Sequence, residues 1–162
     1  MRQYLMFNLG GETYGVGIHA IREILEYPGV TSIPLAPAFL RGVINLRGAV
    51  VPVLDLSVRF GREATRINRR TCIVIIEVQQ AGEINLLGVL VDGVTEVREV
   101  EPDQVEPQPH FGSGLRTDFV AGMLRREQGF IPILDIGSVL AEQELQALIE
   151  LGNDPAPMAS AG

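Results

Sequence analysis

The chain has 162 residues, 46% of them hydrophobic, and its 13 basic residues, all arginine, against 20 acidic ones give a net charge of −7. This balance argues against nonspecific binding to nucleic acid or anionic membranes, and no apolar run approaches the ~20 residues that span a bilayer. The N-terminus lacks the apolar stretch of a signal peptide and a single cysteine excludes an internal disulfide, so we expect a cytoplasmic globular protein.

Short apolar segments separated by glycine-rich or proline-rich turns predict a β-rich fold. The first two predicted strands flank a Gly10-Gly11 turn, and polar residues bound the later ones. The predicted strands are Tyr4–Leu9, Tyr14–Ile18, Val50–Leu56, Thr71–Val78 and Leu86–Val91. Pro52 and Pro132 cannot donate a ladder hydrogen bond, so each proline's strand must lie at a sheet edge or begin outside the ladder.

The C-terminal region carries the one convincing helix signal. Ser138 suits an N-cap, the apolar residues from Val139 to Leu151 have roughly helical spacing, and Gly152 suits a C-terminal cap. Prolines at 28, 34 and 37, and again at 102, 107 and 109, exclude long helices elsewhere. The stretch His19–Leu25 is expected to form at most a helical turn or bend.

One phrase of the sequence occurs twice. Val50–Leu56 returns 80 residues later as Phe130–Ile136, with the Pro-x-x-Asp core unchanged, and Gly15–Ile18 returns 73 residues later as Gly88–Val91. The chain is therefore interpreted as two copies of one β-rich module. Such modules predict two small β-barrels packed together, with a groove between them that could bind a partner.

These repeats suggest how the chain is divided. We expect a first barrel half at residues 1–68, a second half with the C-terminal helix at residues 69–152, and a disordered tail at residues 153–162. A barrel of about 70 residues is marginal by itself, so the two are expected to pack together. The first strand could pair within its own half or cross to the other.

Charge is distributed unevenly along the chain. Residues 41–70 hold seven arginines against Asp55 and Glu63, a local balance of +5, so the remaining residues sum to −12. This basic segment is either a solvated loop with acidic neighbours or a surface that faces an acidic partner.

Little in the sequence favours catalysis. His19 and His110 lie outside any catalytic motif, and we find neither a Cys/His cluster with metal-ligand spacing nor a phosphate-binding loop. We therefore expect no enzyme activity, no metal site and no cofactor. Asp55 and Asp135 occupy equivalent repeat positions, which favours a structural role as acceptors of backbone N–H groups at strand ends.

The segment Phe39–Gly48 is better suited to protein recognition. Arg47 would present a planar, multi-donor group beside apolar side chains, a mixture found among strong interface contacts. The simpler alternative is a hairpin whose arginines are merely solvated.

Arg41–Gly48, followed by Val51–Leu56, closely resembles the signature of CheW-type chemotaxis coupling proteins. Further similarities lie at Tyr14–Ile18, Arg22–Ile24 and Val91–Val94. The resemblance implies an all-β fold of two tandem SH3-like barrels, each five-stranded, packed together with a short C-terminal helix. It implies a non-enzymatic adaptor that links the cytoplasmic tips of chemoreceptors (methyl-accepting chemotaxis proteins) to the regulatory domain of the histidine kinase CheA. Such an adaptor is recruited to membrane-associated receptor arrays without inserting into the membrane.

The resemblance also assigns site residues, with receptor contacts expected to line the inter-barrel groove. The residues expected to contact the receptor are Ile21, Glu23, Gly42, Asn45, Arg47, Gly48 and Val97. The residues expected to contact the kinase are Thr71, Cys72, Ile73 and Phe111. Gly42 and Gly48 would shape the turn that carries Arg47, whereas Ile21 and Val97 could equally be core residues. Phe111 matches a position that helps to join couplers and kinase domains into rings.

Other functions stay open at this point. A coupler of a pilus-motility or surface-sensing pathway would have nearly the same sequence. A β-barrel that binds a small ligand, such as a nucleotide, in the groove is disfavoured because the chain has no phosphate-binding loop and no tryptophan. A small hydrolase would need a nucleophile–base arrangement that the sequence does not suggest. The short segment after the helix favours a free-standing adaptor over a kinase domain fragment.

Overall fold

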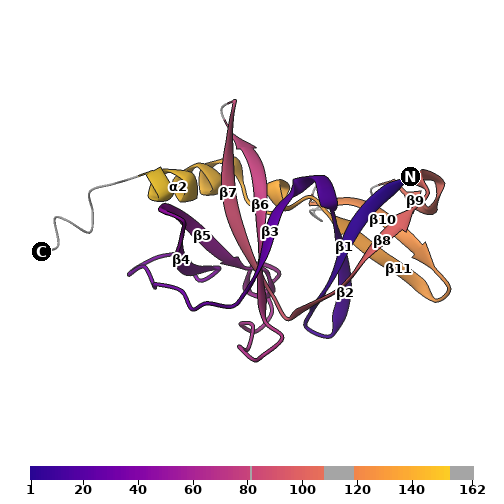
Figure 1. Ribbon diagram of the computed structural model, residues 1–162, viewed down its shortest axis with the longest axis horizontal. Helices are drawn as coiled ribbons and strands as arrows, with labels where there is room; N and C mark the ends of the chain where they lie inside the picture. The colour runs from indigo at the N-terminus through magenta and orange to yellow at the C-terminus, as the bar shows by residue number, and fades with distance from the viewer. Residues whose placement is uncertain (81, 108–118, 154–162) are drawn as a thin grey trace, which may run out of the picture.

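Two β-sheets lie next to each other in the computed structural model, which describes residues 1–80, 82–107 and 119–153 (Figure 1). The first sheet consists, in spatial order, of β8 (Gly93–Val100), β1 (Arg2–Leu9), β2 (Glu12–Gly17), β11 (Gly129–Leu134), β10 (Val120–Arg126) and β9 (Val105–Glu106). The second consists of β3 (Ile21–Glu26), β6 (Cys72–Gln80), β7 (Glu83–Val91), β5 (Ala49–Asp55) and β4 (Leu40–Leu46). The all-β prediction with a C-terminal helix is confirmed.

The helices are few and short. α1 (Leu56–Arg59) follows β5, and α2 (Glu142–Asn153) packs against the second sheet, at the left of Figure 1. Single 3-10 turns occur at η1 (Ile18–Ala20), η2 (Pro102–Gln104) and η3 (Ile136–Ser138). Two expectations were wrong in detail: α2 begins at Glu142 rather than after Ser138, and most of His19–Leu25 belongs to strand β3.

The two sequence repeats exchange hairpins. The β1–β2 hairpin of the first repeat completes the sheet that holds β8–β11, and the β6–β7 hairpin of the second repeat completes the sheet that holds β3–β5. The register follows the repeat, because Ile133 pairs with Gly15 in one sheet and Val53 with Gly88 in the other, both in parallel. The first strand therefore crosses to the second half.

The chain crosses between the sheets at two short connections. Only the three residues of η1 join β2 to β3, and only Asp92 joins β7 to β8. β2 lies between β1 and β11, and β7 lies between β6 and β5, so neither has a free side on which the next strand could pair. β3 and β8 therefore continue into the other sheet. As a result the sheets do not divide at residue 68, the boundary expected from the sequence: β3 to β7 form one sheet, and β1, β2 and β8 to β11 form the other. The expected disordered tail at 153–162 lies, apart from Asn153, outside the described residues.

Pro52 and Pro132 occupy the same place in the two sheets. Pro52 lies opposite Val43 in the β4–β5 hairpin, one residue before β5 begins to pair with β7 at Val53. Pro132 lies likewise one residue before Ile133, where β11 begins to pair with β2. The sequence allowed two arrangements, a strand at a sheet edge or a strand whose first residues lie outside a ladder. The second is observed, because each proline precedes the residues that pair with the parallel neighbour.

Three clusters of buried side chains explain why several strands are apolar on both faces. The largest lies between the sheets and takes Leu5 and Phe7 from β1 and Val74 and Ile76 from β6. The alternate residues of the same strands enter separate clusters, Met6 within the first sheet and Ile73 and Ile75 within the second. Since burial drives folding in proportion to apolar area, the shared cluster holds the two sheets together.

Asp55 is a buried structural carboxylate at the end of β5. Its side chain is 1% exposed and accepts hydrogen bonds from the backbone N–H groups of Ser57 at 3.1 Å and Thr65 at 2.9 Å. The Thr65 hydroxyl donates at 2.9 Å, and Arg41 pairs with the carboxylate at 3.3 Å. The predicted role as an acceptor of backbone N–H groups is confirmed here.

Asp135, the repeat counterpart, is exposed. Its carboxylate accepts a hydrogen bond from the Ser138 hydroxyl at 3.0 Å, and within the described part of the chain it accepts no helix-capping hydrogen bond from a backbone N–H. Both aspartates nevertheless donate their own backbone N–H to a phenylalanine carbonyl at 2.8 Å, Asp55 to Phe39 and Asp135 to Phe119. The backbone geometry is repeated while the carboxylate environments differ.

We expect Asp55→Ala to lower the free energy of unfolding by about 3 kcal/mol, because it removes the carboxylate partner of Arg41 and leaves three buried donors of Ser57 and Thr65 unpaired. The matched variant Asp135→Ala should cost less than about 1 kcal/mol, since its carboxylate is exposed. Urea denaturation of both variants measures this difference. Equal losses would contradict the structural role assigned to Asp55.

Candidate functional site

The edge strands β3 and β8 are repeat counterparts with the same irregularity. Each is the outermost strand of its sheet. Arg22 of β3 has no paired residue in β6, and Thr95 of β8 has no paired residue in β1. These two residues, 73 positions apart, therefore form β-bulges. A bulge turns the side chains that follow it, and in both strands a glutamate and an aliphatic residue come next.

The aliphatic residues after the two bulges are exposed. Val97 is 50% exposed and Ile24, its counterpart, is 42% exposed, whereas Ile21 is partly buried against the shared core. Val97 is therefore a surface residue, and Ile21 lies at the margin of the core. The sequence did not single out Ile24, although its equivalence to Val97 through the repeat was a signal that could have found it.

Arg47 stands at the tip of the β4–β5 hairpin. Arg47 and Gly48 form a two-residue turn with positive φ angles of 50° and 92°, a geometry that favours glycine and asparagine. The Asn45 side chain stabilises the turn by accepting the Gly48 N–H at 2.8 Å. Asn45 and Gly48 thus position Arg47; this turn-shaping role was expected for Gly48, whereas Asn45 was expected only as a receptor contact.

The Arg47 guanidinium makes an ion pair with Glu23 of β3, which joins two of the predicted receptor residues. The Arg47 side chain is 70% exposed, and that of Glu23 is 26% exposed. The hydrogen bond and the charge of Glu23 raise the pKa of Arg47 above its ordinary value, so the side chain is a permanent cation. Because one carboxylate uses only part of its donors, Arg47 retains donors for a partner.

Gly42 does not shape the Arg47 turn. It lies inside β4 with φ of 153°, where the register shifts opposite β5. A Cβ atom there would lie 2.3 Å from the Thr31 carbonyl oxygen. Because glycine has no Cβ atom, Thr31 and Val43 can exchange two backbone hydrogen bonds of 2.9 Å. Gly42 is therefore a close-packing position.

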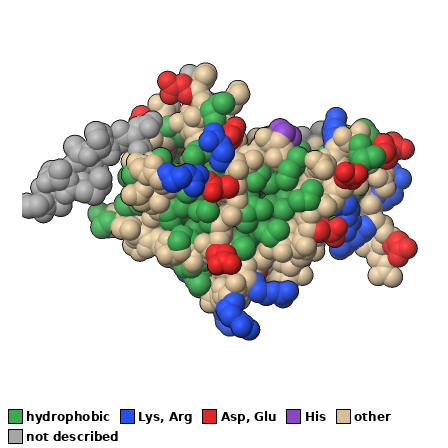
Figure 2. Space-filling model, in the orientation of Figure 1, with side chains coloured by type: hydrophobic (Ala, Val, Ile, Leu, Met, Phe, Trp, Pro, Cys, Tyr) green, Lys and Arg blue, Asp and Glu red, His purple; other side chains and the backbone are tan. Residues whose placement is uncertain are grey.

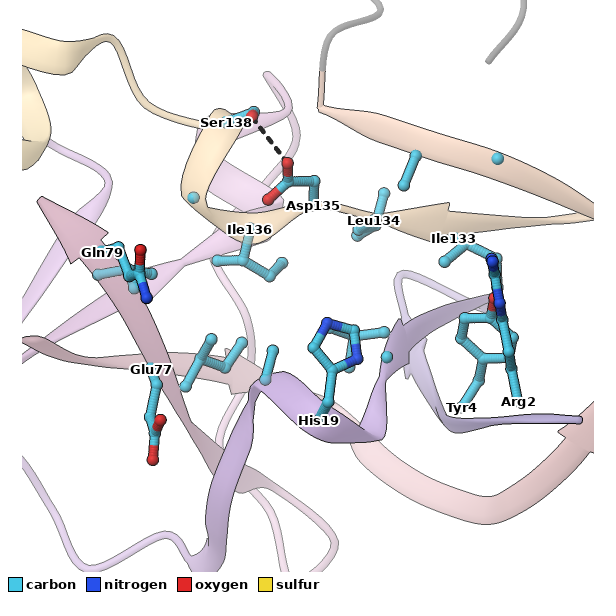
Figure 3. A pocket seen from close by; sticks show the side chains of 18 of the residues that line it. Arg2, Tyr4, His19, Glu77, Gln79, Ile133, Leu134, Asp135, Ile136 and Ser138 are labelled. Carbon is cyan, nitrogen blue, oxygen red and sulfur yellow. Dashed lines mark hydrogen bonds between the residues drawn. The ribbon is translucent and has the colours of Figure 1, made fainter. Parts of the chain in front are cut away.

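A hollow of about 680 Å³ lies between the two sheets (Figure 3). The first sheet contributes Tyr4 and Ile133, the second contributes Glu77, and η1 contributes His19. Figure 3 shows His19 at its rim and the hydrogen bond from Ser138 to Asp135 on the opposite side. The predicted groove exists.

The receptor residues assigned to the groove do not line this hollow. Ile21 and Glu23 lie on β3, and Val97 lies on β8, at the free edges of the sheets. In Figure 2, which shows the same side of the molecule as Figure 1, apolar side chains gather on the surface between β3 and the β1–β2 hairpin. The exposed surface beside the edge strands is thus the better candidate for a docking site.

The kinase-contact strand shows one accessible side chain. Thr71 is 1% exposed and Ile73 is fully buried, so neither side chain can meet a partner directly. Cys72 is partly exposed, and burial, together with the nearby Glu26 carboxylate, raises the pKa of its thiol. Phe111 lies outside the described residues.

The described part of the chain contains no group of three or more His, Cys, Asp or Glu side chains placed to hold a metal ion. Across the same residues, no helix is long and apolar enough to cross a membrane. The site therefore consists of surfaces and turns.

Comparisons with known proteins agree with this description. Residues 3–144 match the model of a family described as CheW-like domain. The chain is 33% identical to "Chemotaxis protein CheW" of Klebsiella aerogenes over 149 residues, covering 92% of this chain and 87% of that protein. It is 34% identical to the protein of the same name of Rhizobium meliloti over 146 residues, covering 90% and 92% respectively.

A solved structure is also similar. The crystal structure of the scaffolding protein TtCheW from Thermoanaerobacter tengcongensis superposes with a TM-score of 0.76 at 31% identity, covering 88% of this chain and 96% of that one. The predicted fold class of two SH3-like barrels is thereby confirmed. A more distant similarity, 25% identity over 126 residues covering 77% of this chain and 68% of the relative, links it to "Protein PilI" of Pseudomonas aeruginosa.

We expect Gly42→Ala to lower the free energy of unfolding by about 3 kcal/mol, because the new methyl group would collide with the Thr31 backbone. Gly61→Ala is the matched control, since Gly61 has φ of +81° but nothing within 4 Å of an added Cβ. The control should cost about 1 kcal/mol from backbone strain alone. Urea denaturation compares them, and a Gly42→Ala variant as stable as the control would refute the close-packing role.

Proposed function

Because the chain belongs to the CheW-like domain family, we propose that it is a non-enzymatic adaptor that couples chemoreceptors to the histidine kinase CheA in bacterial chemotaxis. The family match carries this proposal, since it runs through both sheets from residue 3 to residue 144. Relatives named as chemotaxis CheW proteins and a scaffolding protein of the same fold support it. As such a coupler, the protein would work in the cytoplasm, at membrane-associated receptor arrays.

The receptor contact is proposed at the edge strands and the Arg47 turn. A helical hairpin of a receptor tip would lay its apolar residues against Val97 and Ile24. The remaining donors of Arg47 would fix its orientation, while Glu23 holds the guanidinium in place. The exposure of Val97 and Arg47 supports this assignment.

The kinase contact is proposed at the start of β6. Cys72 would contribute side-chain contact, and the buried Thr71 and Ile73 would fix the shape of the strand beneath it. Phe111 is proposed as a further contact from the family resemblance alone. Signal would pass without chemistry, because a partner that binds one kinase conformation better than another shifts the kinase population.

An equivalent coupler of a pilus-motility pathway is the second candidate. The similarity to "Protein PilI" favours it, but at lower identity and over less of the chain than the chemotaxis relatives. The two candidates share the same mechanism and differ only in the receptors and kinase they serve.

Co-sedimentation tests the proposed function. We expect the purified protein to enter a ternary complex with receptor cytoplasmic fragments and the CheA of its own organism, because each contact uses a separate surface. Omission of the receptor fragment or of CheA should leave the corresponding binary complex. A chain that binds neither partner, or that binds only components of a pilus system, would contradict the chemotaxis assignment.

We expect Arg47→Glu to weaken binding to the receptor fragment by about tenfold or more, because the new carboxylate removes a cation and faces Glu23. The melting temperature should stay close to that of the wild type, since the side chain is exposed. Arg126→Glu, the same change at the hairpin of the other sheet, serves as the control. Isothermal titration calorimetry measures both affinities.

The swapped variant Glu23→Arg/Arg47→Glu separates direct contact from local structure. It restores the ion pair with the charges reversed. Continued weak binding would assign Arg47 to the receptor contact, whereas binding at the wild-type level would show that the pair only stabilises the hairpin.

A further inference from the structure

The loop between α1 and β6 is positively charged, although the chain as a whole is negatively charged. We call residues 61–70 the arginine loop. It holds Arg62, Arg66, Arg69 and Arg70 against Glu63, a balance of +3 in a chain of net charge −7. Figure 1 draws this loop at the lower end of the second sheet, where Figure 2 shows basic side chains on the surface.

Three of these arginines lack an acidic partner. Arg62 pairs with Glu12 at 3.3 Å. Arg66, Arg69 and Arg70 are exposed and make no ion pair with the residues that the structure describes, in contrast to the other arginines of the basic segment. Their charges are therefore available to an external carboxylate.

The arginine loop is held in place by two buried threonines. Thr65 is bound to Asp55 through its backbone N–H and its hydroxyl, both at 2.9 Å. Thr71, 1% exposed, accepts the Asn68 N–H at 2.9 Å through its hydroxyl, and Asn68 in turn accepts the Arg70 N–H at 2.8 Å. A partner that binds a loop already fixed loses less conformational entropy.

The loop continues directly into the proposed kinase contact. Arg66, Arg69, Arg70 and Cys72 line one hollow of about 1160 Å³, together with the acidic residues Glu26, Glu63 and Asp92. The Asp92 carboxylate already accepts the Gly10 N–H at 2.7 Å. Next to the three arginines, Ile67 is 41% exposed and adds an apolar contact.

We propose that the arginine loop is a docking surface for an acidic segment of the kinase regulatory domain. The inference rests on the proposed function and gives the recognition chemistry of its kinase contact. Charge complementarity selects the partner, since three unpaired guanidinium groups favour carboxylates. The loop is joined to Cys72 through the chain, whereas Ile24, Val97 and Arg47, the side chains proposed to meet the receptor, do not line this hollow. The kinase is therefore the proposed partner.

The test compares two triple variants of the full-length chain. Arg66→Gln/Arg69→Gln/Arg70→Gln removes the three unpaired charges. Arg2→Gln/Arg125→Gln/Arg126→Gln removes three exposed charges from the first sheet, away from β8, and gives the same net charge. Binding to the CheA regulatory domain and to the receptor fragment is measured separately by calorimetry, and melting temperatures confirm that both variants fold.

We expect the loop variant to bind the regulatory domain about tenfold more weakly, with receptor affinity unchanged. The salt dependence of kinase binding should also become shallower, because fewer exposed charges contribute. The first-sheet variant should bind both partners like the wild type.

Three outcomes would overturn the inference: unchanged kinase binding by the loop variant, an equal loss in the first-sheet variant, or a loss of receptor binding instead. Each of these requires a wild-type protein that binds both partners. A wild-type protein that binds neither refutes the proposed function itself, so the two failures are distinguishable.

Discussion

The apolar cluster between the two sheets is the constraint on which the rest of the molecule depends. β1 and β6 each send alternate side chains into this cluster and the others into the cluster of their own sheet. A strand buried on both faces is not exposed to water on either side, so its run of apolar residues cannot be interrupted without cost. The runs Leu5–Phe7 and Ile73–Ile76 satisfy this requirement.

The exchange of hairpins places the proposed docking surfaces at the margins of this core. Because β6 and β1 occupy interior positions, β3 and β8 become the edges of the two sheets. Both edges have bulges, which interrupt the regular ladder and discourage the addition of a further strand. The side chains beyond the bulges are then free to serve a partner without exposing a flat strand edge to aggregation.

Much of the architecture was predictable because it repeats. The doubled Pro-x-x-Asp phrase revealed two modules, and the observed pairing of Val53 with Gly88 and of Ile133 with Gly15 follows the same two offsets. The exchange was not predictable from the phrase, because Gly15 and Gly88 lie in similar segments and either could pair with Val53. The choice is visible only in the structure, where β2 and β7 are each paired on both sides and leave no place for β3 and β8 in the sheets they follow.

Other misses have local causes. β3 was not recognised because Ile24, an apolar residue, occupies an exposed position and obscures the alternation. Val139 and Leu140 are buried after the turn that follows β11. Their spacing relative to the later apolar residues is that of a helix, which is why the sequence placed the start of α2 too early. The Arg47–Glu23 ion pair joins a turn residue to a β3 residue 24 positions away, and Ile73 is buried. Neither could be deduced without the fold.

The links between the sheets have a mechanical consequence. A one-residue link at Asp92, a three-residue link at η1 and a common core join the sheets. Cys72, at the surface proposed for the kinase, pairs with Glu26 at the end of β3, the strand proposed to meet the receptor. A displacement of β3 by one partner would therefore reach the other partner's contact across a single pair of strands.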